Sequence, residues 1–215
     1  MSTDLKAVVK VGDFSRGGKS RVPVAALDHD FQPDTVLTPA GVLLPAQGEL
    51  FISMVESKAT SDCIVDELQH VWNLVKPRFP RVRTLLLNQD NGPENHSRRT
   101  QFIQRIVEFA DRNQVNIRLA YYPPYHSKYN PIERCWGALE NYWRGSVLDS
   151  VQCVLEMAGA MRWKDTKPVV RLVQKVYETG VHLTKDAMKA LEQRLKRLPG
   201  LEKWFVDIPF LPTSA

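Results

Sequence analysis

The feature that most constrains this chain is the stretch from Leu85 to Trp143, which begins LLLNQDNGPEN and ends PPYHSKYNPIERCWGALENYW. It opens with a short apolar run, Thr84 to Asn88, bounded by the turn residues Asn-Gly-Pro, which is typical of a buried strand. Asp90 lies just past the end of this run. Ligand-binding groups of α/β sheets collect at the carboxyl ends of strands, so the pattern predicts a functional carboxylate at a sheet edge.

A second carboxylate is predicted at the start of a helix. The loop from Pro123 to Tyr129 leads to Asn130, a good N-cap, followed by Pro131 at the first helical position and Glu133 at the third. The helical spacing that follows gives an apolar stripe, assigned to the core, of Ile132, Cys135, Trp136, Leu139 and Trp143. Glu133 lies off this stripe and can therefore face a cleft.

The chain between Asp90 and Glu133 is long enough to bring the two carboxylates back together. It is predicted to hold a helix over residues 98–112 and a strand over residues 116–121. Two carboxylates without nearby Cys or His ligands form a hard oxygen site, which suits Mg²⁺ or Mn²⁺. Two such ions could act on a phosphodiester, which usually requires a third carboxylate. Asp4 is our candidate for the third, with three alternatives: Asp13, Asp28 and Asp30.

Both acidic motifs also have ordinary structural interpretations. Asp90-Asn91-Gly92 is a common turn sequence, so Asp90 could serve only an Asx-turn. Asn130-x-x-Glu133 has the spacing of a capping box, so Glu133 could serve only to close the helix end. The functional interpretation gains weight because the motifs occur together and in order, with the expected elements between them.

The rest of the chain predicts an α/β layered fold with a mixed sheet and a helical C-terminal part. Further strands are predicted over 5–11, 21–27, 41–44 and 49–55, the last two as a hairpin, and a helix over 62–76. Helices are also predicted over 150–160, 169–177 and 184–198. We therefore expect a domain over residues 1–150 and a helical C-terminal extension over 151–215.

Composition limits the class of protein. At 215 residues with 43% hydrophobic content, the chain can build a real core. No apolar run approaches the ~18–20 residues of a membrane span, and three sparse cysteines indicate reduced thiols in a cytosolic protein. The net charge is +5, of which +4 falls beyond residue 150. That surplus favours a polyanionic partner, although surplus lysines also occur on ordinary solvated surfaces.

Three motifs carry a resemblance to a known family. The strand end DNGPEN, the loop PPYHSKYNPIERCW and the opening DLK…VGDFSRGGKS resemble bacterial DDE insertion-sequence transposases, and within them the Rhodopirellula-type group, relatives of the mariner-like enzymes. The resemblance extends into the tail through SVQCVLEMA and KPVVRLVQKVYETG. It implies an RNase H-like fold and metal-dependent DNA strand cleavage and strand transfer. The implied catalytic triad is Asp4, Asp90 and Glu133, holding two Mg²⁺ or Mn²⁺ ions.

The resemblance also implies partners. The expected partner is DNA, in the form of transposon ends and target DNA. No interaction with a membrane is expected, and the resemblance leaves open whether the protein forms a homodimer. Family members carry an N-terminal helix-turn-helix region without a counterpart here, so we expect a catalytic domain alone. Five residues are candidate DNA contacts, or simply solvated loop residues: His126, Lys128, Arg134, Arg16 and Lys19. Two other functions stay open, an inert fragment that only binds DNA or self-associates, and a stand-alone RNase H-like nuclease.

Overall fold

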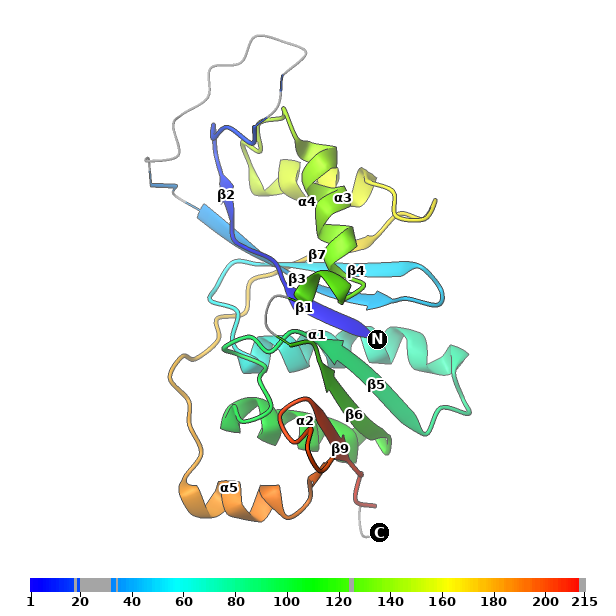
Figure 1. Cartoon of the computed structure of the whole chain (residues 1–215). Coiled ribbons are helices and arrows are strands. Elements are labelled where there is room, and N and C mark those ends of the chain that lie inside the picture. Colours follow the sequence, from blue (N-terminus) through cyan, green and yellow to red (C-terminus); the bar gives the residue numbers. More distant parts are fainter. Residues whose placement is uncertain (18, 20–31, 34, 124–125, 213–215) are drawn as a thin grey trace.

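A single mixed sheet organises the molecule (Figure 1). The structure, a computed structural model, describes residues 1–17, 19, 32–33, 35–123 and 126–212. Within these residues nine strands follow the order β7-β4-β3-β1-β5-β6-β9-β8, with β2 paired to β3. The strands are β1 Ser2–Leu5, β2 Val9–Val11, β3 Thr35–Leu44, β4 Glu49–Val55, β5 Thr84–Gln89, β6 Asn116–Tyr121, β7 Val169–Val173, β8 Lys196–Arg197 and β9 Phe205–Ile208.

The short strand β1 is the junction between two halves of the sheet. On one side it pairs antiparallel with β3, where Asp4 lies opposite Gly41. On the other side it pairs parallel with β5 through Ser2 and Asn88. β6 continues the parallel half beside β5. Because β1 and β5 run the same way, their carboxyl ends meet at one edge of the sheet.

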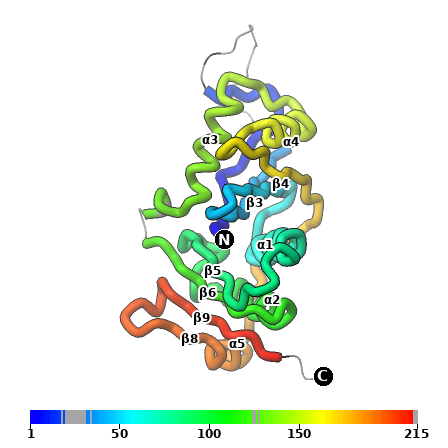
Figure 2. The backbone as a smooth tube through the Cα atoms, turned by 90° about the vertical axis from the view of Figure 1, so that its right-hand side faces the viewer, coloured from blue at the N-terminus to red at the C-terminus, as the bar shows by residue number. Residues whose placement is uncertain are grey.

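Helices cover both faces of this sheet. The helices are α1 Ser61–Val75, α2 Thr100–Asn113, α3 Glu133–Trp143, α4 Val151–Ala160 and α5 Lys185–Glu192, with 3₁₀ turns η1 Lys76–Arg78 and η2 Ser127–Tyr129. α1 and α2 lie on one side of the strands and α3 on the other, as Figure 2 shows. α5 packs against α2. None of the helices in the described ranges combines the length and apolar composition that a membrane span requires.

Strand alternation divides the core between the two faces. On β4, Phe51 packs with α1 and α2, whereas its neighbours Leu50 and Ile52 pack with α3 and α4. Successive side chains of a strand point to opposite faces, so a strand that is apolar along its whole length must be covered twice. β4 is buried on both faces from Leu50 to Val55, which is why the sheet carries helices on both sides.

Several sequence predictions are confirmed. β6 has the predicted bounds, and β5 extends the predicted strand by one residue, to Gln89. The hairpin β3–β4 is present with a longer first strand, and the five residues of the α3 stripe are all buried. The cysteines are free thiols, and Cys63 and Cys135 are buried. The strand predicted over 21–27 and the alternatives Asp28 and Asp30 lie outside the described residues.

The prediction for the first strand was wrong in its bounds. The predicted strand over 5–11 is replaced by β1, which starts at Ser2, and by the separate strand β2. The polar residues Ser2 and Thr3 are buried because their hydroxyls have internal partners, Asn130 and Gln89 respectively. Asp4 therefore lies within β1, a strand that pairs with β3 on one side and with β5 on the other, and not ahead of the first strand.

Of the three helices predicted in the C-terminal part, one is present as predicted, one is a strand, and one is shorter than predicted. α4 is present, but residues 169–177 form strand β7, which pairs parallel with β4. The short run VVRLV is compatible with the period of a helix or of a strand. It forms a strand because it pairs with the otherwise free edge of β4. The helix predicted over 184–198 ends at Glu192, because Lys196 and Arg197 pair with β9. The tail thus completes the sheet at both ends, and the boundary near residue 150 remains a prediction.

Candidate active site

Asp4 and Asp90 lie at the same edge of the sheet. Each follows by two residues the pair Ser2 and Asn88, which joins β1 to β5. Both carboxylates are among the residues that line a cleft with a volume of about 570 Å³, and Glu133 is not among them. The sheet register thus brings together two residues that are 86 positions apart in the sequence.

The start of α3 is attached directly to β1. Asn130 does not act as the predicted N-cap; its buried side chain accepts a hydrogen bond from the Ser2 hydroxyl and donates one of 3.2 Å to the Thr3 carbonyl. The Ser2 hydroxyl in turn accepts from the backbone N–H of Ile132 at 3.1 Å. A residue of β1 therefore satisfies a free N–H at the start of α3, which fixes the position of Glu133 relative to Asp4.

Trp136 provides a second link between α3 and β1. Its Nε1–H donates to Oδ2 of Asp4 at 2.8 Å. The ring lies over Gly41, the residue opposite Asp4, so close that an added Cβ would be 2.5 Å from Cη2 of Trp136. The sequence predicts Trp136 only as a core residue. Its position three residues after Glu133 places it one helical turn along, beside the acidic edge.

The charge of Asp90 acts on both Asp4 and Glu133. Burial and the negative charge of Asp90 raise the pKa of Asp4 to about 7; the hydrogen bond from Trp136 opposes the rise, and Glu133 adds to it. Burial and Asp90 likewise raise the pKa of Glu133, while the cation of Lys6 lowers it. Like charges brought together at a partly buried edge resist ionisation, and a cation between them would relieve that repulsion.

Asp90 is held by the turn that follows β5. Asn95, which is buried, donates from Nδ2 to Oδ1 of Asp90 at 3.1 Å. The Asn95 carbonyl accepts from the Tyr121 hydroxyl at 2.8 Å. A Cβ on Gly92 would lie 3.3 Å from Oδ2 of Asp90, so the glycine leaves room for the carboxylate to turn inward. Asp90 is therefore supported from its own turn and from β6.

Cations also gather beside α3. Lys6 forms an ion pair with Glu140, which lies two turns beyond Glu133 on the same helix. Arg16 approaches Glu140 at 3.6 Å and stacks over the ring of Trp143 at 4.9 Å. Arg16 thus has partners within the fold, in addition to its predicted role as a DNA contact.

The remaining predicted residues lie at the surface. His126 stacks on Tyr129 with ring centroids 5.8 Å apart, and Lys128 lies over the same ring. Arg134 and Lys19 are exposed. Asp13, an alternative third carboxylate, is also exposed, and it is not among the charges that raise the pKa of Asp4 or of Glu133.

The chemistry of the three carboxylates suits a divalent cation. Carboxylate oxygens are the ligands that Mg²⁺ and Mn²⁺ prefer, and Trp136 and Asn95 orient two of the three carboxylates. Among the described residues, however, no three His, Cys, Asp or Glu side chains lie close enough together to hold one ion. The carboxylates would therefore have to move towards one another in order to bind a metal.

The mixed sheet with helices on both faces is an RNase H-like fold. A family model described as the Rhodopirellula transposase DDE domain matches residues 1–209, so the chain belongs to this family and is a DDE transposase catalytic domain. A solved structure, the Mos1 transposase paired-end complex with left transposon end, is similar with a TM-score of 0.52 and 11% identity. The match covers 72% of this chain and 45% of the Mos1 chain, and it shows the fold alone. A comparison with curated proteins gave no match.

Proposed function

We propose that this domain cuts and joins DNA strands with two divalent cations held by Asp4, Asp90 and Glu133. Membership of the transposase family supports this class of reaction. The observation that carries the site is that the register of β1 and β5 brings Asp4 and Asp90 to the same edge of the sheet, while the start of α3, next to Glu133, is hydrogen-bonded to β1. The ions would be Mg²⁺ or Mn²⁺, and the substrates would be transposon ends and target DNA.

Each residue has a distinct part in this proposal. Bound ions would supply activation of an attacking oxygen and stabilisation of the leaving oxygen. The three carboxylates hold the ions and do not act as covalent nucleophiles. Trp136 orients Asp4 and Asn95 orients Asp90, so two of the three proposed ligands are supported by hydrogen bonds from neighbouring side chains. A water molecule cuts one strand, and the freed 3′-OH then attacks target DNA.

The proposal extends to the organisation of the chain. Residues 1–150, which carry every proposed ligand, would form the catalytic domain, and residues 151–215 would form a C-terminal extension whose strands complete the sheet. Binding to DNA would depend mainly on phosphates and would weaken with salt. Such a protein would work in the bacterial cytoplasm, at the nucleoid.

Nicking of a supercoiled plasmid in the presence of Mn²⁺ tests this function. We expect the unmodified chain to nick the plasmid, and Asp4→Asn, Asp90→Asn and Glu133→Gln to lose the activity. Asp13→Asn is the matched control, because Asp13 is an exposed carboxylate of the same N-terminal segment. Activity that survives Asp4→Asn but not Asp13→Asn would move the third ligand to Asp13.

An inert fragment is the second candidate. It is favoured by one observation, that no three ligand side chains converge to metal-binding distance within the described residues. This alternative predicts DNA binding without nicking by any variant and without Mn²⁺ binding. Cleavage restricted to RNA–DNA hybrids would instead indicate a stand-alone nuclease.

A further inference from the structure

The segment that joins α1 to β5 is strongly basic. Between Glu67 and Asp90 the sequence contains four Lys or Arg residues and no Asp or Glu. The four are Lys76, Arg78, Arg81 and Arg83, all with exposed side chains. We refer to residues 76–83 as the basic loop.

The fold directs these cations outward. Phe79 and Val82, which alternate with the basic residues, pack against the core formed with α1 and α2. The backbone is held by turn hydrogen bonds, from Phe79 N–H to Lys76 O at 2.9 Å and from Val82 N–H to Phe79 O at 3.1 Å. The carbonyl of Arg83 accepts from Asn116 of β6 at 2.9 Å. A loop anchored in this way presents its charged side chains at fixed positions.

Interactions within the fold account for only two of the four cations. Arg78 forms a two-pronged ion pair with Glu49, with both N–O distances 2.8 Å. Lys76 follows the last turn of α1, where a positive charge complements the helix dipole. Arg81 and Arg83 have no ion pair with any carboxylate of the described residues. Two exposed charges therefore remain without a role in the fold.

The basic loop and the acidic edge lie at opposite ends of the same strand, as Figure 1 shows. β5 has six residues, which corresponds to a length of about 20 Å. A DNA duplex advances about 3.4 Å per base pair, so a duplex cut at the acidic edge can reach the loop within roughly six base pairs. The two surfaces are thus close enough to contact the same duplex.

We propose that the basic loop binds the phosphate backbone of duplex DNA next to the site of cleavage. This inference rests on the proposed function, in which DNA is the substrate. Exposed arginines that neutralise phosphates add affinity and fix the position of the duplex without reading its sequence. An acidic protein surface would be attracted by the same charges, but the proposed substrate of this domain is itself a polyanion.

The test compares two double variants of equal charge change. Arg81→Gln/Arg83→Gln removes the unpaired cations of the loop, and Lys185→Gln/Lys189→Gln removes two exposed cations of α5. Binding of each chain to a random-sequence duplex is measured by fluorescence anisotropy between about 50 and 200 mM NaCl. The slope of log K against log salt is negative, and each lost phosphate contact makes it shallower by about 0.9. We therefore expect the slope of the loop variant to be shallower by about 1.8.

The outcomes separate this inference from the proposed function. A shallower salt dependence of DNA binding for the loop variant than for the α5 variant, with unchanged melting temperatures, supports the loop as a DNA contact. Equal slopes for the two variants would overturn the proposed DNA contact, and this is the result expected if the loop instead binds an acidic protein. Absence of DNA binding by the unmodified chain would also overturn it. Loss of the metal site would appear instead in Mn²⁺ binding, which neither double variant should change.

Discussion

The indole Nε1–H of Trp136 donates a 2.8 Å hydrogen bond to Oδ2 of Asp4, which joins the helix that carries Glu133 to the central strand. Gly41, opposite Asp4 on β3, leaves the space that the indole ring occupies. The orientation of one acidic residue thus depends on a helix more than 130 residues away in the sequence.

Trp136→Phe should weaken Mn²⁺ binding by about 10-fold, the lower end of the effect of removing a residue that orients a metal ligand. The hydrogen bond from Trp136 lowers the pKa of Asp4, so its loss leaves this carboxylate more protonated near neutral pH. Protons then compete better with the metal. Isothermal titration calorimetry measures the difference.

Trp143→Phe is the matched control for this change. Trp143 is also buried on α3 and also donates to a carboxylate, but its partner at 2.7 Å is Glu140. We expect a comparable loss of stability and little change in Mn²⁺ affinity. Equal losses of affinity in the two variants would mean that Trp136 has no special relation to the site.

Gly41→Ala should destabilise the fold by about 1–3 kcal/mol, because the new methyl group would lie 2.5 Å from the Trp136 ring in a packed core. Urea denaturation measures the change in the free energy of unfolding. Gly159→Ala in α4 is the control, since the nearest atom to its Cβ is 3.9 Å away and alanine favours a helix by up to about 1 kcal/mol. A neutral Gly41→Ala would contradict the close approach of Trp136.

Asp4→Asn should stabilise the metal-free protein above about pH 7, where the unmodified chain must ionise a carboxyl group whose pKa is raised to about 7. A raised carboxyl pKa means that the folded state binds the proton more tightly than the unfolded state, so the unmodified chain loses stability as pH rises from about 4 to about 7. The difference between the two proteins should therefore be largest at high pH and vanish near pH 4. Thermal melting in a chelator across this range measures it.

Addition of Mn²⁺ provides the control for the Asp4→Asn experiment. The ion should raise the melting temperature of the unmodified chain above pH 7, because a bound ligand stabilises the folded state. It should have a smaller effect on Asp4→Asn. A stability difference that does not vary with pH would show that the charge of Asp4 is not its source.

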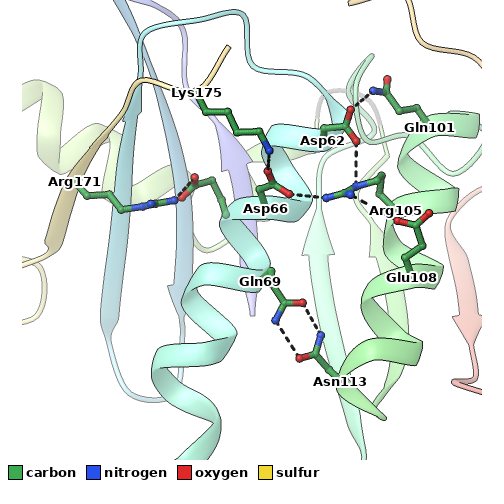
Figure 3. A network of polar contacts seen from close by, with 10 residues as sticks. Asp62, Asp66, Gln69, Gln101, Arg105, Glu108, Asn113, Arg171 and Lys175 are labelled. Atoms are coloured by element: carbon green, nitrogen blue, oxygen red, sulfur yellow. Dashed lines mark hydrogen bonds and ion pairs between the residues drawn. The ribbon is translucent and has the colours of Figure 1, made fainter. Parts of the chain in front are cut away.

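Arg171→Ala should cost about 2–3 kcal/mol of stability. Figure 3 shows Arg171 of β7 reaching towards α1. It forms an ion pair there with the carboxylate of Glu67, whose side chain is only 3% exposed. Glu67 also accepts from the hydroxyl of Ser53 on β4, so these contacts join β7 to the sheet and to α1. The expected loss is below the 3–5 kcal/mol of a fully buried pair, because Arg171 is itself partly exposed.

Lys175→Ala is the control for this network. Lys175 pairs with Asp66 on the same helix as Glu67, but its side chain is 61% exposed. Exposed ion pairs contribute about 0–1 kcal/mol, so denaturant unfolding should hardly change. Similar losses for both variants would mean that the burial of Glu67 does not decide the energetics.

Local patterns in the sequence predicted the elements that carry the acidic motifs. The apolar run of β5, the exact bounds of β6 and the stripe of α3 follow from periods that a buried strand or helix imposes. Asp90 and Glu133 could be singled out because turn and helix-start signals lie next to them. These signals act over a few residues and need no knowledge of the fold.

Contacts between distant segments were not predictable in the same way. β7 was predicted as a helix, because its strand form depends on the free edge of β4. Asn130 was predicted as an N-cap, but its side chain bonds to Ser2 and Thr3, which lie more than 120 residues earlier. The role of Trp136 likewise depends on where β1 lies, and the sequence around Trp136 contains no sign of it.

The most direct test of the metal site is a calorimetric titration of Mn²⁺ into the unmodified chain, Asp90→Asn and Glu133→Gln, with Asp13→Asn as the control. Asparagine at position 90 retains an oxygen for the hydrogen bond from Asn95, so the turn should keep its structure. We predict two Mn²⁺ ions bound per unmodified chain and per control, and loss of binding in the other two variants. Absence of Mn²⁺ binding by the unmodified, folded chain would contradict the metal site and leave a transposase fold without its chemistry.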